Sequence, residues 1–327
     1  MKERDMLDQQ DNQSFPVLNR AYNTVFQPGR LTVGLVVPIE NNAHQAVPKM
    51  HDHIERVQLA ERLGFTSVWL RDVPFKVPSF GDAGQLFDPF VYLGALAMST
   101  QDIALGVASI VLPLRHPAHV AKAAASVDVL SDGRLLLGVA SGDRPEEFPA
   151  MGQGFDDRGA RFREAMAYIG AMAEDNSVFE NTLGRLPGHL DMLPKPSGPR
   201  LPMLITGGSQ QSPDWVAQHG DGWMTYPRDP VTQGRVISDY RDRVARAGAG
   251  QKPVMQSLYV DVLADPNAPP RPIHMGFQSG TTYLLRYLRD IQALGVNHVA
   301  LNLRFNQSNV ETALDQISQE ILPDFAQ

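Results

Sequence analysis

Residues 103–152 read IALGVASIVLPLRHPAHVAKAAASVDVLSDGRLLLGVASGDRPEEFPAMG, and they give the strongest indication of the fold class. Two apolar runs, at 103–112 and 134–140, flank an alanine-rich segment that opens at Pro117 and stops at Ser131-Asp132-Gly133. The pattern predicts a strand, a helix and a second strand, and such βαβ units build parallel sheets. Both strands end in small residues, which leave room for a flat ligand at the edge where parallel α/β folds place their chemistry.

The same alternation of strands and helices continues on both sides of this unit. Strands are expected at residues 31–38, 66–72, 103–112, 134–140, 201–207, 221–226, 254–263 and 298–303. Helices are expected at residues 48–63, 88–99, 117–131, 158–173, 212–218, 231–246, 280–294 and 310–325. Eight β/α alternations without a break in composition predict the α/β class, as a single (β/α)8 TIM barrel over residues 31–327.

Three segments lie outside this alternation. Residues 1–30 are expected to form a short N-terminal extension, with the first dozen residues frayed and a short helix at 15–26 that covers one end of the barrel. Two loop insertions are expected. One is an irregular stretch at 174–200, and the other is a loop at 264–279 with four prolines, placed after the seventh strand where active-site lids are common.

Composition bounds the function. The chain has 327 residues, of which 43% are hydrophobic and 20% charged, which suffices for a large core. It has no cysteine, which excludes disulfides, thiolate metal ligands and cysteine nucleophiles. The net charge is −7 and the basic residues are scattered, so no nucleic-acid partner is expected. No apolar run reaches the roughly 18 residues of a membrane span, and the polar start does not resemble a secretory signal, so a cytoplasmic location is expected.

The motif ITGGSQQSPDW at 205–215 is the strongest candidate for ligand binding. Gly207 and Gly208 allow close approach of backbone N–H groups, and Ser209 and Ser212 add hydroxyls. Ser212 is also a good N-cap before a proline. A loop of this kind binds phosphate, but an ordinary Gly-rich turn before a capped helix has the same pattern. No GxxxxGK[ST], strand-linked GxGxxG or GxSxG motif occurs, so a P-loop, a Rossmann dinucleotide site and a hydrolase elbow are all unsupported.

Three polar positions after the other strands are weak catalytic candidates. Asp72 and Arg71 end the second strand, where they could contact the edge of a polar heterocycle or form a salt bridge at the barrel rim. His116 could be a general base or a helix-entry residue before Pro117, and the second interpretation is favoured. Arg144 belongs to a charged group with Asp143, Glu146 and Glu147, which could do acid–base work but more often forms a solvated loop face.

No metal site is expected. His116 and His119 are three residues apart, with no nearby carboxylate to complete a site.

Residues 106–143, GVASIVLPLRHPAHVAKAAASVDVLSDGRLLLGVASGD, resemble the luciferase-like flavin-dependent oxidoreductases, the bacterial luciferase-like monooxygenase family. Members of that family have a strand, an LP…HP turn, an LD.LS.GR helix exit and a G.G-type strand in this order. Residues 205–224, ITGGSQQSPDWVAQHGDGWM, are similar to the family's phosphate loop and following strand. The resemblance spans residues 31–325, and the fold that it implies is the same barrel.

The resemblance implies a cofactor, FMN or in some branches a deazaflavin, at the carboxyl ends of the strands. Ala108-Ser109 matches the position of a non-prolyl cis peptide behind the flavin ring, and Asp72 matches a position near the polar edge of the ring. The remaining implied contacts are Ser141, Gly142 and Asp143 at the ring or ribityl chain, and Gly207, Gly208, Ser209 and Ser212 at the phosphate.

The chain departs from bacterial luciferase at two positions. Val73-Pro74 stands where luciferase has a histidine after the second strand, and Ser141 stands where it has an arginine. Light emission from a long-chain aldehyde is therefore not expected. The sequence predicts a monooxygenase that uses reduced FMN and O₂ on a small organic substrate.

Reduced flavin is expected to come from a separate flavin reductase, because no nicotinamide-binding motif is present. Two alternatives stay open: a deazaflavin-dependent hydride-transfer oxidoreductase, and a flavin-binding barrel without turnover. A hydrolase or isomerase barrel is weaker still. The apolar helix at 88–99, together with the habit of the family, predicts a homodimer.

Overall fold

The computed structural model describes residues 14–41, 45–80 and 84–326. Eight parallel strands close into a barrel in the order β1-β2-β3-β4-β7-β8-β9-β12, with β12 pairing back to β1. Their bounds are β1 (Thr32–Val36), β2 (Ser67–Leu70), β3 (Ala104–Val111), β4 (Leu135–Ala140), β7 (Met203–Thr206), β8 (Gly222–Thr225), β9 (Val254–Val262) and β12 (His298–Asn302). The predicted (β/α)8 barrel and its eight predicted strands are confirmed. The predicted fraying of the first dozen residues falls outside the described ones.

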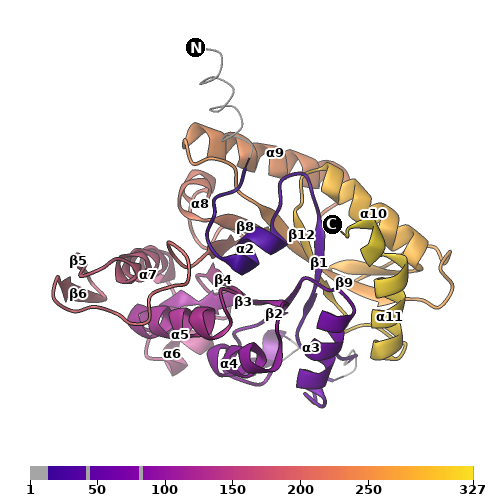
Figure 1. Ribbon diagram of the computed structural model, residues 1–327, viewed down its shortest axis with the longest axis horizontal. Coiled ribbons are helices and arrows are strands. Elements are labelled where there is room, and N and C mark those ends of the chain that lie inside the picture. Colours follow the sequence, from indigo (N-terminus) through magenta and orange to yellow (C-terminus); the bar gives the residue numbers. More distant parts are fainter. Residues whose placement is uncertain (1–13, 42–44, 81–83, 327) are drawn as a thin grey trace, which may run out of the picture.

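Helices form a ring around the strands (Figure 1). They are α3 (His53–Arg62), α4 (Pro89–Ser99), α5 (Pro117–Leu130), α7 (Arg158–Ala173), α8 (Pro213–His219), α9 (Pro230–Arg246), α10 (Thr281–Ala293) and α11 (Val310–Glu320). Several begin with a polar cap before proline, as at Asp88, whose carboxylate accepts from the N–H groups of Phe90 and Val91. No helix in the described part of the chain is both long and apolar enough to cross a bilayer.

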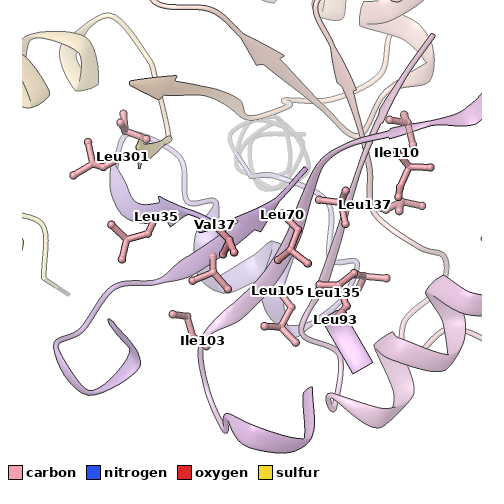
Figure 2. Close-up of a cluster of buried hydrophobic side chains, with 14 of the residues drawn as sticks. Leu35, Val37, Leu70, Leu93, Ile103, Leu105, Ile110, Leu135, Leu137 and Leu301 are labelled. Carbon is pink, nitrogen blue, oxygen red and sulfur yellow. The ribbon is translucent and has the colours of Figure 1, made fainter. Parts of the chain in front are cut away.

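The outward side chains of the strands pack under these helices. Figure 2 shows Leu70, Leu105 and Leu135, from three neighbouring strands, close to Leu93 of α4. All four are fully buried. Because side chains alternate along a strand, the other half of the strand residues point into the barrel and form a second cluster.

The amino end of the barrel is closed by α2 (Arg20–Val25). Tyr22, Val25 and Phe26 are buried in one cluster with Trp69 and Leu136 from inside the barrel. The Tyr22 hydroxyl also donates to the carbonyl of Asp221, at 2.6 Å. The prediction of a short helix that covers one end of the barrel is therefore confirmed. Only the opposite, carboxyl end of the barrel remains open to a ligand.

Four expectations about local structure were wrong. The insertion at 174–200 contains a hairpin, β5 (Val178–Asn181) and β6 (Gly184–Pro187), which stands out beyond α7 in Figure 1. The loop at 264–279 contains β10 (Arg271–Ile273) and β11 (Gly276–Ser279), and β11 adds to β9. The last helix ends at Glu320, followed by the 3-10 turn η3 (Leu322–Asp324), and the helix expected from residue 48 begins at His53. Pairing with another strand decides such short strands, across a turn in both hairpins and with β9 for β11, and the local pattern does not show it.

The apolar helix α4 presents one side to solvent. The side chains of Val91 and Met98 are 73% and 71% exposed, while Tyr92, Leu93 and Leu96 on the other side are buried. An exposed apolar stripe is compatible with a subunit interface. The homodimer stays a prediction.

A histidine lies inside the barrel near its amino end. His298 is fully buried, and its Nδ1 lies 2.7 Å from the Thr32 hydroxyl, which itself donates to the carbonyl of Val25. Nδ1 must therefore be the donor. Nε2 accepts from the indole N–H of Trp69 at 2.9 Å and lies 2.9 Å from the Ser67 hydroxyl. The neutral ring is fully hydrogen-bonded, and a second ring proton would face the indole N–H. Burial lowers the pKa of His298 from 6.5 to about 3.

This histidine predicts a loss of stability in mild acid. The unfolded chain takes up a proton as pH falls through 6.5, whereas the folded chain resists protonation down to about pH 3. Stability contributed by His298 is thus present above pH 6.5 and declines below it, by about 2 kcal/mol between pH 7 and pH 5. Urea unfolding at several pH values should show this slope in the wild type and a flatter slope in His298→Asn. Parallel slopes would contradict the assignment.

Candidate functional site

The carboxyl ends of the eight strands meet at one mouth of the barrel. Strand alternation shows which side chains face it. Trp69 in β2, Leu136 in β4, Leu204 in β7 and Met255 in β9 all belong to the interior cluster. Positions two or four residues further along each strand therefore also face inward, toward the mouth.

Four of the inward positions near the mouth carry small side chains. They are Ala108, Ala140, Thr206 and Ser257, and each is partly exposed even though strands flank it on both sides. Solvent therefore reaches the floor of the mouth. The hydroxyls of Ser109 and Thr206 are hydrogen-bonded across this floor. A floor of this kind accommodates a flat ring system.

The peptide bond between Ala108 and Ser109 is cis, as the family resemblance implied. The neighbouring strand makes room for this backbone. A Cβ at Gly138 would lie 2.1 Å from the carbonyl oxygen of Val107. The β3–β4 register also shifts between Val107 and Ile110.

The loop after β7 presents unpartnered backbone donors. Gly207, Ser209 and Gln210 have φ angles of +54°, +44° and +60°. The N–H groups of Gly208, Ser209 and Gln210 donate to no acceptor in the described part of the chain. The Gln211 side-chain amide anchors the loop by donating to the carbonyl of Gly159 at 2.8 Å. Successive amides in such a turn form a concavity that binds anions.

The two serines of this loop have local roles in the structure. The Ser209 hydroxyl donates to the carbonyl of Thr206 at 2.8 Å. The Ser212 hydroxyl accepts from the N–H of Trp215 at 3.2 Å, which caps α8. Because α8 has only seven residues, the prediction of a phosphate site depends on the loop amides rather than on a helix dipole.

Asp72 faces away from the mouth, because it follows the inward Arg71. Its carboxylate accepts from Arg115 Nη2 at 2.8 Å and Nε at 3.0 Å, and from the N–H of Val111 at 3.1 Å. Burial by itself would lower the pKa of Arg115, but the carboxylates of Asp72 and Asp88 raise this pKa above its usual value. The rim salt bridge is the arrangement that the structure shows. A contact between Asp72 and a cofactor ring stays a prediction.

His116 is exposed and caps α5. Its Nδ1 accepts from the N–H of Ala118 at 3.3 Å, and its Nε2 lies 3.2 Å from the carbonyl oxygen of Leu183. This is the helix-entry role favoured from the sequence. No group of three or more potential metal ligands occurs among the described residues.

The segment after β4 contains three of the predicted cofactor contacts. Ser141 is buried, and Gly142 has a φ of +84° where a Cβ would lie 2.7 Å from Val111. The carbonyl of Gly142 accepts from Arg158 Nε at 3.2 Å. Asp143 is exposed. These residues lie at the mouth, as predicted, and their contact with a cofactor stays a prediction.

Of the four charged residues after β4, Asp143 and Glu146 are exposed, as a solvated face requires, but for Arg144 and Glu147 that interpretation was wrong. They are only 6% and 2% exposed, because Glu147 begins the short helix α6 (Glu147–Ala150) that packs against the barrel. Arg144 stacks over Phe80 at 4.6 Å from the ring centroid, and its Nη1 has no hydrogen-bond partner. Glu147 Oε1 also lacks one. Burial lowers the pKa of Arg144 and raises the pKa of Glu147.

Three further residues lie at the mouth, of which the sequence had indicated Arg71 as a ligand contact but neither tyrosine. Arg71 extends β2 on its inward side, Tyr226 does the same for β8, and Tyr259 lies inward on β9. Burial raises the pKa of Tyr226, and the charge of Asp143 adds to this effect. Strand parity at the carboxyl ends was the signal that could have identified both tyrosines.

Comparisons with known proteins agree with this geometry. The family model described as "Luciferase-like monooxygenase" matches residues 31–317. An uncharacterised protein of Mycobacterium tuberculosis is 30% identical over 225 residues, covering 64% of this chain and 79% of that protein. An F420-dependent glucose-6-phosphate dehydrogenase of Amycolatopsis mediterranei is 28% identical over 218 residues, covering 65% of this chain and 62% of that protein.

Solved structures show the same fold. The monooxygenase RslO1 from Streptomyces bottropensis superposes with a TM-score of 0.75 at 20% identity, covering 90% of this chain and 100% of that one. An F420-dependent secondary alcohol dehydrogenase gives 0.74 at 18% identity, covering 91% and 100%.

Proposed function

Because the chain belongs to the luciferase-like monooxygenase family, we propose that it is an oxidoreductase that binds a flavin-type cofactor across the mouth of its barrel. The observation that carries this proposal is the open floor of small side chains at Ala108, Ala140, Thr206 and Ser257, beside a loop with unpartnered amides. The floor fits a planar ring and the amides fit a phosphate.

Different residues would hold the phosphate and the ring of such a cofactor. The amides of Gly208, Ser209 and Gln210 bind the phosphate. Ala108, Ser109 and the end of β4 would hold the ring.

We propose FMN as the cofactor and monooxygenation of a small organic substrate as the reaction. When bound, reduced FMN supplies the electrons with which O₂ is split between substrate and water. A separate reductase supplies the reduced flavin. The net charge of −7 favours FMN over a cofactor with a polyanionic tail.

A deazaflavin-dependent dehydrogenase is the second candidate. It is favoured by two relatives of known type, the glucose-6-phosphate dehydrogenase and an F420-dependent hydroxymycolic acid dehydrogenase of Mycobacterium tuberculosis, which is 27% identical over 199 residues. Both candidates place a phosphate and a tricyclic ring at this mouth.

Cofactor titration tests the proposal and separates the candidates. The purified chain is titrated by calorimetry with FMN, reduced FMN under anaerobic conditions, and F420. We expect binding at about micromolar or better for one form of FMN, and an absorbance spectrum with bands near about 370 and 450 nm for oxidised flavin. Tighter binding of F420, with a band near about 420 nm, would select the second candidate. Absence of binding by all three would refute both.

Ser209→Asp tests the phosphate loop. We expect its FMN dissociation constant to rise at least about tenfold, because the new carboxylate repels the phosphate. Riboflavin, which has no phosphate, should bind wild type and variant alike. Ser126→Asp in α5 is the control, since it adds the same charge away from the mouth. Equal FMN affinity in Ser209→Asp and wild type would exclude the loop as the phosphate site.

A further inference from the structure

Three arginines converge on the mouth from different strands. Arg71 ends β2 on its inward side, Arg144 follows β4, and Arg304 follows β12. They are close enough to influence one another. After burial, which is the larger cause, repulsion by Arg71 lowers the pKa of both Arg144 and Arg304. The carboxylates of Glu147, Asp143 and Glu146 offset part of the charge of Arg144, whereas both oxygens of Asp72 are bound by Arg115.

Arg144 differs from the buried structural arginine of this chain. Arg134 is 2% exposed, and its guanidinium donates hydrogen bonds to Ser131, Thr100, Ile103 and Ala97. Arg144 is almost equally buried, yet it donates no hydrogen bond to any described residue, and its Nη1 has no partner. A buried cation without hydrogen bonds is costly, and proteins retain such groups at sites of function.

The loop at 73–80 covers this arginine. Phe80 lies under the guanidinium, and the backbone of Phe75 donates to Glu147, next to Arg144. Both phenylalanines are otherwise substantially exposed, at 39% and 42%. Their side chains form an apolar rim around a cationic group. Aromatic and apolar surface beside an unsatisfied guanidinium matches a ligand with an apolar body and an anionic head.

We propose that Arg144, supported by the charges of Arg71 and Arg304, binds a carboxylate on an apolar substrate of this enzyme. That the carboxylate belongs to a substrate rests on the proposed function, whereas the binding of a carboxylate by Arg144 does not. An arginine fork pairs with the two oxygens of a carboxylate, and Phe80 holds the fork in place. The substrate class is thus an organic acid, and Arg144 determines specificity.

The alternative source of negative charge is the cofactor. The test must therefore separate an anionic substrate from an anionic part of FMN. Benzoate serves as the probe, and benzamide is its neutral counterpart of the same shape. Both are titrated by calorimetry into cofactor-free protein and into FMN-loaded protein at low salt. The variants are Arg144→Met, Arg144→Lys and the control Arg246→Met, which removes the same charge from an exposed position on α9.

We expect wild type to bind benzoate at least about tenfold more tightly than benzamide. Arg144→Met should bind the two probes alike, Arg144→Lys should show an intermediate preference, and Arg246→Met should behave as wild type. FMN affinity of Arg144→Met should stay within about twofold of wild type. Arg144→Lys keeps a positive charge beside Glu147 and should keep the wild-type melting temperature, so that a weaker benzoate preference in this variant is not an effect on folding.

Two outcomes would overturn the inference. One is equal binding of benzoate and benzamide by wild type, or no benzoate binding up to about 50 mM. The other is a loss of FMN affinity in Arg144→Met with benzoate binding unchanged, which would assign the arginine to the cofactor and leave the proposed function intact. Failure of wild type to bind any flavin refutes the proposed function alone, since benzoate binding is read in the cofactor-free protein.

Discussion

Ala140→Leu is expected to abolish cofactor binding while the barrel stays folded. Ala140 ends β4, faces the mouth and is partly exposed on its floor. A leucine there projects three more carbon atoms into the space that we assign to the ring. Because rigid strands on both sides hold the position, the ring has no route around it. We expect the FMN dissociation constant to rise at least about 100-fold, which corresponds to about 2.7 kcal/mol.

The measurement is quenching of FMN fluorescence, with circular dichroism and the melting temperature as checks on the fold. Ala245→Leu is the matched control, since it makes the same change at an exposed position on α9. Affinity should be unchanged in the control. Wild-type affinity in Ala140→Leu would mean that the ring does not lie across the floor, and the proposed function would lose its main support.

Gly138→Ala is expected to produce the largest loss of stability. An added Cβ would lie 2.1 Å from the carbonyl oxygen of Val107 and 2.7 Å from the sulfur of Met224. Met224 can move, but Val107 belongs to the β3–β4 ladder and cannot move without breaking it. We expect the free energy of unfolding to fall by about 3 kcal/mol, at the upper end of overpacking effects.

Urea unfolding followed by circular dichroism measures this loss. Gly170→Ala is the control, because Gly170 lies inside α7 with nothing within 4 Å of the added Cβ. The control should gain up to about 1 kcal/mol from helix propensity. A Gly138→Ala variant as stable as wild type would show that the backbone of β3 can shift away from the added Cβ without loss of stability.

Most of the barrel could be predicted because its signals are local. Asp88 before Pro89 starts a helix through a cap that involves only the next three residues. The apolar run at 103–112 similarly carries its own evidence for a buried strand. Hairpins such as β5–β6, by contrast, depend on pairing across a turn with few apolar residues. No local pattern separated them from an irregular loop.

The candidate site was predictable only in part. The loop at Gly207–Ser212 was located because its glycines and the cap of the following helix are close together in the sequence. The role of Arg144 was missed for the opposite reason. Its burial comes from the loop at 73–80, which is more than sixty residues away in the chain and meets Arg144 only in the folded protein.

Length, composition and the order of apolar runs by themselves established a parallel barrel, excluded cysteine chemistry and indicated a phosphate loop after the fifth barrel strand. Only the tertiary structure decided which neighbour at each strand end faces the mouth. Arg71 points in and Asp72 points out, and this follows from strand alternation once the interior cluster is known. Secondary structure depends on interactions between residues near in sequence, whereas the burial and pairing of a charge depend on segments that only closure of the barrel brings together.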